Sequence, residues 1–348
     1  MKTSMIPADK MPAVIDNKYC EHPVQMNLEL TTACPLHCPQ CYVHLNTGRE
    51  MPLETALYWI RDAAEAGICD INLSGGETMC YPHLTELIRE CHKLGLESNI
   101  ALSGVYVTEK KLREFIDAGV TRIFVSLNGS TKAVNEKTRD GYELAISTLE
   151  MLRDMEWENT VINWVMHEYN ADDFPNMIAL AERYNVSALV ILAFKPDSAH
   201  QLGSYPTGEQ IRTVAGQIRE YKGAVTIGAE SCFSQLRTLE AKSFFGSLNY
   251  GMFRGCGAGR SGLSVSVEGK LTPCRHIEIE EEYDHIMEYW NQSEFLAKLR
   301  TVEDSRKEPC KGCKWEKNCL PCQAVGLKLH NELNYGMQEC TATEAADE

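Results

Sequence analysis

The feature that most constrains the fold is a sixfold alternation of short apolar stretches with longer amphipathic stretches, which begins near residue 24. A short apolar run is typical of a buried strand, and a longer stretch with a period of about 3.6 residues is typical of a surface helix. Gly67, Gly95 and Gly119 follow three of the predicted helices, in the place of a C-terminal cap. The predicted strands are residues 25–30, 70–74, 97–102, 122–127, 161–167 and 188–194. The predicted helices are residues 53–66, 82–94, 109–118, 141–155, 173–184 and 208–221.

Six successive strand–helix units predict an α/β fold with a parallel sheet. The sheet could curve into an open partial barrel or lie flat in a doubly wound fold, and the periodicity fits both. In either fold, functional residues are expected at the carboxyl ends of the strands. After residue 221 the pattern changes to a predicted hairpin at residues 255–276, a helix near residues 291–300 and a cysteine-rich remainder. We therefore expect three parts, which are an N-terminal arm (residues 1–23), the repeated units (24–230) and a cysteine-rich domain (231–348).

Composition excludes several classes of partner. The net charge of −15 comes without a basic stripe, so neither nucleic acid nor an anionic membrane is an expected partner. No apolar run approaches the roughly 20 residues that span a bilayer, and the N-terminus lacks a signal-peptide core, so a cytosolic location is expected. In that reducing compartment, the fifteen cysteines are better candidates for metal ligands than for disulfides.

The first cysteine array follows the first predicted strand. Cys34, Cys38 and Cys41 have the spacing C-x3-C-x2-C. Zinc sites and fully ligated iron–sulfur clusters usually have a fourth ligand nearby. Three close thiolates on one loop suit a four-iron cluster that leaves one iron open to a small molecule.

This spacing resembles that of the radical S-adenosylmethionine (SAM) superfamily, and Ser74-Gly75-Gly76-Glu77 after the second strand resembles its Gly-Gly-Glu motif. The resemblance covers about residues 24–230 and implies a partial (β/α)6 barrel. It also implies that the three cysteines hold a [4Fe–4S] cluster, whose open iron chelates SAM for reductive cleavage to a 5′-deoxyadenosyl radical. The motif is implied to bind the SAM amino group, since glycines permit close approach and a carboxylate complements an ammonium.

Other SAM contacts are implied by position. Ser126 and Asn128 lie in a Ser-Leu-Asn-Gly run that resembles the family's Ser-Leu-Asp-Gly, where the serine meets the SAM carboxylate. Arg139 is implied to pair with that carboxylate, Asn99 to contact the ribose and Asn170 to lie near the adenosine.

Two positions depart from the family pattern. Asn128 replaces an aspartate, so a role that needs a charge there is lost. Gln40 stands where the family has an aromatic residue before the third cysteine, and Tyr42 follows that cysteine, where it could stack on adenine instead.

The second cysteine array resembles the SPASM domain, an extension that carries two auxiliary iron–sulfur clusters, which would make three [4Fe–4S] clusters in all. The resemblance implies an outer cluster held by Cys310, Cys313, Cys319 and Cys340, and an inner cluster held by Cys256, Cys274 and Cys322. Taken alone, the close pairs within residues 310–322 could instead form a zinc site. The upstream array and the cysteines of the hairpin favour iron–sulfur clusters.

The inner cluster lacks a fourth ligand from this motif. Gly262 stands where some relatives have a cysteine, and Cys232 is the nearest unassigned thiol. Cys232 could be the fourth ligand, a catalytic hydrogen donor in the active site, or a buried packing residue. The remaining cysteines are predicted to be structural, namely Cys20, Cys69, Cys80 and Cys91.

Relatives with this extension mostly modify peptides or proteins. We expect an enzyme that forms a thioether or carbon–carbon crosslink in a ribosomally made peptide, or epimerises it, and an open inner cluster would suit a peptide thiolate. Expected partners are a flavodoxin- or ferredoxin-like electron donor and a separate leader-binding protein or surface, because the 23-residue arm is too short for a leader-binding domain. Lys195 and His167, at predicted strand ends, could contact substrate.

Two alternatives stay open. One is a sulfatase-maturing, formylglycine-generating enzyme, but Arg275 stands where such relatives have an aspartate as proton acceptor. The other is a non-catalytic iron–sulfur or zinc protein.

Overall fold

The computed structural model describes residues 12–43, 46–195, 205–239, 255–308, 310–317 and 319–334. Within them, one nine-stranded sheet has the strand order β11-β10-β3-β4-β5-β6-β7-β8-β9. Its strands are β3 (Gln25–Glu29), β4 (Asp70–Ser74), β5 (Glu97–Leu102), β6 (Arg122–Ser126), β7 (Thr160–Met166), β8 (Ala188–Ala193), β9 (Thr226–Ala229), β10 (Gly262–Val265) and β11 (Leu271–Thr272).

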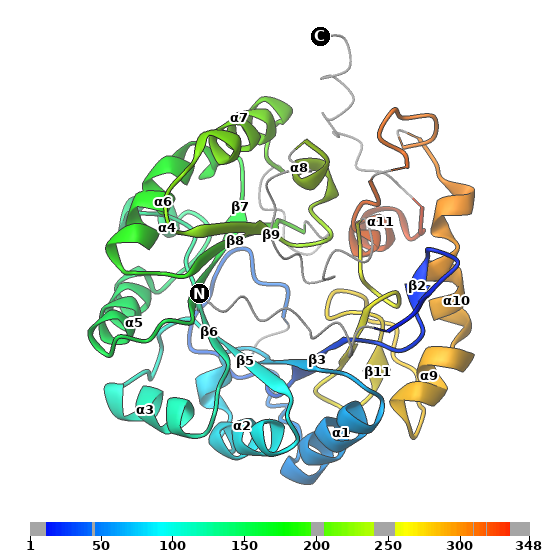
Figure 1. The fold of residues 1–348 in the computed structure, drawn as a ribbon, viewed down its shortest axis with the longest axis horizontal. Coiled ribbons are helices and arrows are strands. Elements are labelled where there is room, and N and C mark those ends of the chain that lie inside the picture. Colours follow the sequence, from blue (N-terminus) through cyan, green and yellow to red (C-terminus); the bar gives the residue numbers. More distant parts are fainter. Residues whose placement is uncertain are drawn as a thin grey trace.

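The strand order decides between the two predicted architectures. Strands β3 to β9 are parallel and follow one another in chain order, whereas a doubly wound sheet reverses its order at a switch point. The sheet is curved, its helices surround it on the outside, and β9 and β11 form its two edges (Figure 1). The prediction of an open partial barrel is therefore confirmed.

The outer layer contains the six predicted helices. They are α1 (Leu53–Glu65), α2 (Leu84–Lys93), α3 (Glu109–Asp117), α5 (Tyr142–Asp154), α6 (Phe174–Arg183) and α7 (Gly208–Glu220). Shorter elements among the described residues are α4 (Lys132–Asn135) and the 3-10 helices Thr78–Cys80, Ala171–Asp173 and Val302–Ser305. All six predicted helices and all six predicted strands are present, with ends shifted by at most two residues. No helix among the described residues has the length and apolarity that a membrane span requires.

The two faces of the sheet differ in polarity because side chains alternate along a strand. In β3, Met26 and Leu28 are fully buried in the apolar core. The intervening positions carry amides that form a ladder across neighbouring strands. Asn72 Nδ2 donates to Asn27 Oδ1 (3.2 Å), and Asn99 Nδ2 donates to Asn72 Oδ1 (3.1 Å). The inner face of the barrel is therefore lined by polar groups.

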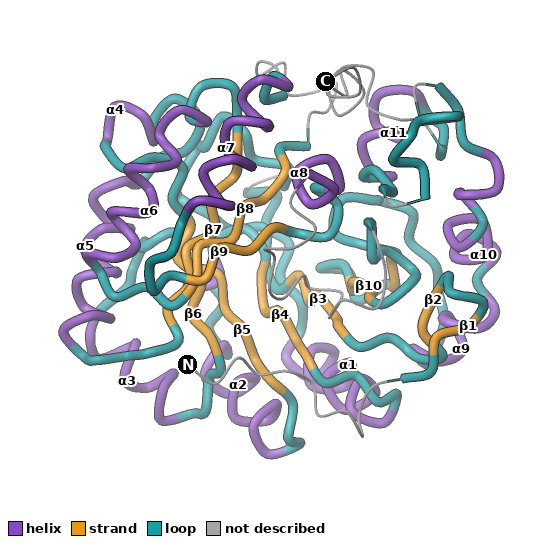
Figure 2. Tube along the Cα trace, turned by 45° about the horizontal axis from the view of Figure 1, so that its top comes forward, coloured by secondary structure: helices purple, strands orange, loops and turns teal. Residues whose placement is uncertain are grey.

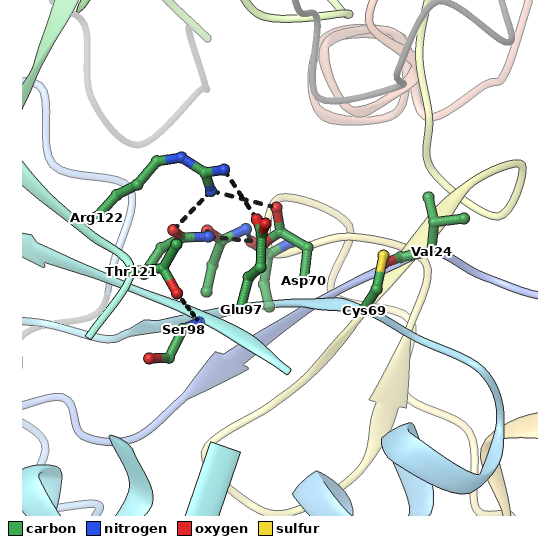
Figure 3. A network of polar contacts seen from close by, with 10 residues as sticks. Val24, Cys69, Asp70, Glu97, Ser98, Thr121 and Arg122 are labelled. Atoms are coloured by element: carbon green, nitrogen blue, oxygen red, sulfur yellow. Dashed lines mark hydrogen bonds and ion pairs between the residues drawn. The ribbon is translucent and has the colours of Figure 1, made fainter. Parts of the chain in front are cut away.

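This ladder ends in an ionic network at the amino ends of β4, β5 and β6 (Figure 3). Arg122 Nη1 donates to Asn99 Oδ1 (3.0 Å), and Arg122 Nη2 lies 2.8 Å from Glu97 Oε2. Asn99 Nδ2 also donates to Asp70 Oδ1 (2.7 Å). The buried carboxylate of Asp70 thus has a hydrogen-bond donor and a cation nearby, as a buried charge requires.

The cysteine-rich region continues the same sheet. Strand β10 pairs parallel with β3 and antiparallel with β11, which confirms the predicted hairpin. The expected boundary near residue 230 falls directly after β9, a strand that the sequence reading missed. The other described elements of this region are α8 (Ser234–Leu239), α9 (Ile286–Gln292), α10 (Glu294–Arg300) and α11 (Gln323–His330).

The predicted helix near residues 291–300 is present as α10, which begins at Glu294, and α9 precedes it as a separate helix. Ser293 lies between them in an extended conformation, and its hydroxyl accepts a hydrogen bond from the Leu296 amide (3.0 Å). That contact is an N-terminal cap, which starts a new helix at Glu294.

The described part of the N-terminal arm packs on the far end of the chain. Strands β1 (Val14–Ile15) and β2 (Tyr19–Cys20) form a hairpin, which lies beside α9 and α10 (Figures 1 and 2). Trp290 Nε1 donates to the carbonyl of Cys20 (3.0 Å), and the Cys20 amide donates to Arg260 O (2.7 Å). The arm is therefore anchored to the cysteine-rich region.

A substitution in β10 tests whether that region shares the barrel core. Leu263 is 1% exposed and lies beside Met26 of β3. Leu263→Ala should lower the free energy of unfolding by about 2–5 kcal/mol, because it removes buried methyl groups and leaves a cavity. Urea unfolding followed by fluorescence measures this loss. Leu94→Ala is the control, since Leu94 is 37% exposed and its change should stay within about 0.5 kcal/mol. A Leu263 variant as stable as the control would show that β10 lies outside the common core.

Candidate active site

The first cysteine array lies on the loop after β3, against the turn after β4. The amide of Gly76 donates to Thr31 O (2.6 Å), and the amide of Glu77 donates to Ala33 O (2.8 Å). A Cβ added to Gly75 would lie 2.5 Å from Thr31 O, and one added to Gly76 would lie 2.5 Å from Ala33 O. The two glycines therefore permit the close approach of their turn to the cysteine loop.

The loop is held by side chains that the sequence reading missed. Asn46 donates through Nδ2 to the carbonyl of Cys34 (3.0 Å) and accepts from its amide (3.2 Å). The amide of Asp140 donates to Cys38 Sγ (3.4 Å), while Asp140 Oδ2 accepts from the amide of His37 (2.9 Å). Amide hydrogen bonds to a thiolate sulfur tune the potential of an iron–sulfur cluster. The Asp140 amide would therefore stabilise the thiolate of Cys38 if Cys38 binds a cluster. The signal available in the sequence was its position beside Arg139.

The donor set fits a cluster. Among the described residues, no three Cys, His, Asp or Glu side chains converge as ligands of one metal ion would. The thiols of Cys34, Cys38 and Cys41 lie on one loop within electrostatic reach of one another, and each thiolate of a four-iron cluster binds its own iron. Burial raises the pKa of the Cys34 thiol to about 11. Metal binding would stabilise the thiolate against this cost.

Glu77 presents a buried carboxylate beside this loop. Its side chain is 1% exposed, and it accepts hydrogen bonds from the Met79 amide (3.0 Å), the Ser103 amide (2.9 Å) and the Ser103 hydroxyl. A carboxylate has about four acceptor positions, so one remains for a ligand. Burial raises the pKa of Glu77 above its ordinary value of 4.5, although the three hydrogen bonds oppose the shift. A ligand ammonium would favour its charged form.

Arg139 supplies the opposite charge. Its Nε is buried and has no hydrogen-bond partner among the described residues, and its charge lies within electrostatic reach of Glu77 and Cys41. Asn135 holds the backbone of this residue through a hydrogen bond from Nδ2 to Arg139 O (2.7 Å). A cation and a carboxylate within electrostatic reach of each other match the two charges at the amino-acid end of SAM. Ser126, the last residue of β6, is half-buried.

Asn128 connects the cysteine loop to β7. Its Nδ2 donates to Gln40 Oε1 (2.8 Å) and to Thr138 Oγ1 (2.9 Å), and its Oδ1 accepts from the Val165 amide (3.2 Å). Aspartate could not donate the first two of these bonds, which explains why asparagine is suited to this position. Gln40 Oε1 also contacts His167 Nε2 (2.6 Å). Asn128 and Gln40 therefore position the loop, and a direct contact of Asn128 with SAM stays a prediction.

Two other predicted SAM ligands have their amides occupied within the chain. Asn170 Nδ2 donates to Asn128 O (2.8 Å) and Val165 O (2.9 Å), and Asn170 Oδ1 accepts from the His167 amide (2.7 Å). Asn99 belongs to the polar ladder and faces Arg122 at the amino end of β6. Both amides support the strands, and their contacts with SAM stay predictions.

The segment after Cys274 reaches the same end of the sheet. Arg275 Nη2 donates to Ser74 Oγ (2.6 Å), and its Nε lies 3.3 Å from Glu29 Oε1. The ring centroid of His276 lies 4.2 Å from that of Tyr42. Tyr42, predicted to stack on adenine, therefore packs against the cysteine-rich region and joins the two arrays.

Two neutral imidazoles in this region have an unpartnered nitrogen. The Nδ1 atoms of His167 and His276 are buried and have no hydrogen-bond partner among the described residues. Burial lowers the pKa of His167 to about 4, and it also lowers the pKa of His276. Each imidazole is therefore neutral near pH 7. His167 Nε2 donates to Gln40 Oε1, so its Nδ1 can accept one further hydrogen bond, and His276 Nδ1 also has room for one.

The second array also gathers several thiols. The thiols of Cys232 and Cys322 lie within electrostatic reach of each other, and this interaction lowers the pKa of the Cys322 thiol below its ordinary value. Cys256 and Cys274 lie within electrostatic reach of Cys322. Lys195, predicted as a substrate contact, instead forms an ion pair with Glu230 (2.6 Å).

The predicted outer ligands are described in part. Cys310, Cys313 and Cys319 precede α11, and the Trp315 amide donates to Cys313 Sγ (3.4 Å). Cys340 lies outside the described residues.

Replacing Asn128 by aspartate tests its role in positioning. Asn128 is fully buried, and Asn128→Asp would bury a carboxylate and remove two hydrogen bonds. Breaking a buried polar network in this way should cost about 2–4 kcal/mol of stability near neutral pH. Because burial raises the pKa of the new carboxyl, the loss should shrink as the pH falls and the group becomes neutral. Urea unfolding between pH 5 and pH 8 measures both effects. Asn159→Asp, at an exposed position, is the control, and equal stability of the two variants would contradict the role.

Comparisons with known proteins agree with this arrangement. Residues 28–181, which include the first cysteine array, Glu77, Asn128 and Arg139, match the family described as the radical SAM superfamily. The chain is 28% identical over 344 residues to the PqqA peptide cyclase of Methylorubrum extorquens (strain PA1), covering 93% of this chain and 84% of that protein.

Solved structures share the fold over most of the chain. SuiB of Streptococcus suis bound to the precursor peptide SuiA has a TM-score of 0.75 at 15% identity, covering 93% of this chain and 77% of SuiB. Native anSMEcpe with bound AdoMet and the Cp18Cys peptide has a TM-score of 0.70 at 14% identity, covering 92% of this chain and 95% of that one. The cysteine loop, Glu77 and Arg139 all lie within residues 28–181, the part of the chain that matches the radical SAM superfamily.

Proposed function

We propose that this radical SAM enzyme modifies a ribosomally made peptide by forming a thioether or carbon–carbon crosslink or by epimerisation. The observation that carries the proposal is the position of Glu77 and the unpartnered Arg139 Nε beside the cysteine loop. The peptide class is supported by the similarity to the PqqA peptide cyclase over 93% of the chain and by the fold shared with SuiB in its complex with SuiA.

We further propose three [4Fe–4S] clusters. Cys34, Cys38 and Cys41 would hold the SAM-binding cluster, and the two sets of the second array would hold an inner and an outer cluster. A four-iron cluster with SAM at its open iron supplies reductive cleavage of SAM to a 5′-deoxyadenosyl radical, which can abstract hydrogen from a carbon. A flavodoxin- or ferredoxin-like protein would provide the electron, and a separate protein or surface would bind a leader peptide.

The chain's own groups orient the reactants. Glu77 would accept the SAM ammonium at its remaining acceptor position, and Arg139 would pair with the SAM carboxylate. Both groups are buried or half-buried, so water competes weakly and the charges attract more strongly than at the surface. Asn128 and Gln40 would keep the cysteine loop in place against β6 and β7.

The environment of position 275 favours peptide crosslinking or epimerisation over formylglycine formation. A guanidinium stays protonated at any ordinary pH, so Arg275 cannot serve as a proton acceptor. Its contacts with Ser74, Asn27 and Glu29 also hold it against the sheet. The position thus has a structural role in joining the two arrays.

Removing the Glu77 charge tests the SAM site. Glu77→Gln should weaken SAM binding about ten- to a hundredfold, because a charge-assisted hydrogen bond of roughly 1.5–3 kcal/mol is lost. For the wild type, SAM affinity should be full where Glu77 is ionised and the SAM amino group is still an ammonium, and it should fall as the pH drops through the raised pKa of Glu77. The variant should lack this fall. Isothermal titration calorimetry across pH values measures both, with Glu86→Gln, at an exposed position, as the control. Unchanged SAM affinity in the Glu77 variant would remove this residue from the site.

The function is tested with anaerobically reconstituted protein, SAM, a reductant and short peptides encoded near its gene. The wild type should contain about twelve iron and twelve sulfide, form 5′-deoxyadenosine, and yield a peptide that has lost two hydrogens or has gained deuterium from D2O. Changing Cys34, Cys38 and Cys41 together to Ala should leave about eight irons and abolish both products. Mass spectrometry and iron and sulfide assays measure these outcomes. Stoichiometric zinc without sulfide in the wild type would refute the proposal.

A further inference from the structure

Three chain segments meet around Leu320, at the inner set of the second array. The turn after β9 is tied there because the Ser234 hydroxyl donates to Leu320 O. Gly255 approaches so closely that an added Cβ would overlap Leu320. Cys232, Cys256 and Cys322 lie within two residues of these contacts, so the backbone brings three thiols together from distant parts of the sequence.

The thiols themselves are in mutual reach. The Cys232 thiol lies within electrostatic reach of Cys322. Cys256 and Cys274 interact electrostatically with Cys322 and with each other. Together with the backbone contacts at Leu320, these interactions place the four thiols in one region of the structure.

The other unassigned cysteines lie in different surroundings. Cys20 belongs to β2 and Cys91 to α2, and both are fully buried. Cys69 donates its thiol hydrogen to Val24 O (3.4 Å) on the opposite end of the sheet, and Cys80 lies in the 3-10 helix after Glu77. Among the described residues, Cys232 is the unassigned thiol that contacts the array.

A cation stands beside the four thiols. Lys195 lies within electrostatic reach of Cys232, Cys322 and Cys274, and its side chain is 9% exposed. Four thiolates around one cluster carry a large negative charge in a region with little water, where a nearby ammonium is worth more than at the surface. The ion pair with Glu230 therefore fixes the Lys195 ammonium near the thiols, where it would offset the negative charge of a cluster with four thiolate ligands.

We propose that Cys232 is the fourth protein ligand of the inner cluster, so that Cys232, Cys256, Cys274 and Cys322 leave none of its irons open. The inference rests on the proposed function and narrows it. A closed inner cluster exchanges electrons but does not bind a substrate thiolate, so the peptide need not carry a cysteine. This differs from the open inner cluster that the motif alone suggested.

The test uses the full-length chain with Cys34, Cys38 and Cys41 changed to Ala, so that only the auxiliary clusters remain. Adding Cys232→Ala should either lose about four irons and four sulfides or change the EPR spectrum of the reduced inner cluster. Millimolar 2-mercaptoethanol should restore or further shift that spectrum by filling the open position, while the parent protein should not respond to it. Cys80→Ala, a half-buried thiol outside the array, is the matched control and should leave iron content and spectrum unchanged.

Two outcomes would overturn the inference. One is a Cys232→Ala variant with unchanged iron content and EPR spectrum. The other is a change in the EPR spectrum of the parent inner cluster when 2-mercaptoethanol is added. A lowered urea midpoint of the Cys232→Ala variant would reveal a folding defect. In that case Cys232→Ser is measured instead, and the inference requires that it change the EPR spectrum of an inner cluster that is still intact. The readout needs no turnover, so failure of the proposed function would appear separately, as wild-type protein with intact clusters that yields no peptide product.

Discussion

The site depends on the ion pair between Arg275 and Glu29. Arg275 follows Cys274 of the second array, whereas Glu29 ends β3 just before the first array. The guanidinium also donates to Ser74, the residue before Gly75-Gly76, and Ser74 in turn donates to Glu29 (2.9 Å). A largely buried guanidinium is stable only when it is paired and hydrogen-bonded. These contacts therefore hold three segments in fixed relative positions, which are the turn at Gly75-Gly76, the first cysteine loop and the segment after Cys274.

The polar inner face of the sheet makes this arrangement possible. Outward side chains such as Met26 and Ile71 fill the layer between sheet and helices, while the inward positions carry Asn27, Asn72 and Asn99. These three inward amides hydrogen-bond one another across the strands, so they make the inner face polar while their own groups are paired. Arg275 completes the ladder at one end through Asn27 (3.2 Å), and Arg122 completes it at the other.

Local periodicity was sufficient to predict the six strand–helix units, because each buries one apolar face that repeats at a fixed spacing. It was not sufficient for β9, whose four residues include Gly228, or for the pairing of β10 with β3, which joins residues more than two hundred positions apart. The residues of the site also differ in whether a local motif reveals them. Glu77 and Arg139 were proposed from local motifs. Asn46 and Glu29 have no such motif, and Asp140 has only its position beside Arg139 as a signal. Asn128 shows most clearly what a motif leaves out. The motif suggested a SAM contact for this residue, and the structure adds hydrogen bonds from its amide to Gln40 and Thr138.

The two cysteine arrays have different surroundings, and the difference bears on their roles. Beside the first array, Arg139 Nε lacks a partner and Glu77 retains an acceptor position, so the charges there are available to a ligand. Beside the inner set of the second array, Lys195 is already paired with Glu230 and faces thiols of the chain itself. The charges beside the first array thus suit a zwitterionic ligand, whereas the charges beside the inner set of the second array are already paired within the chain. The imidazoles of His167 and His276, which burial keeps neutral, lie near the first array and the Cys274 segment. Their open nitrogens suit hydrogen bonds to a peptide backbone better than pairing with a charged side chain.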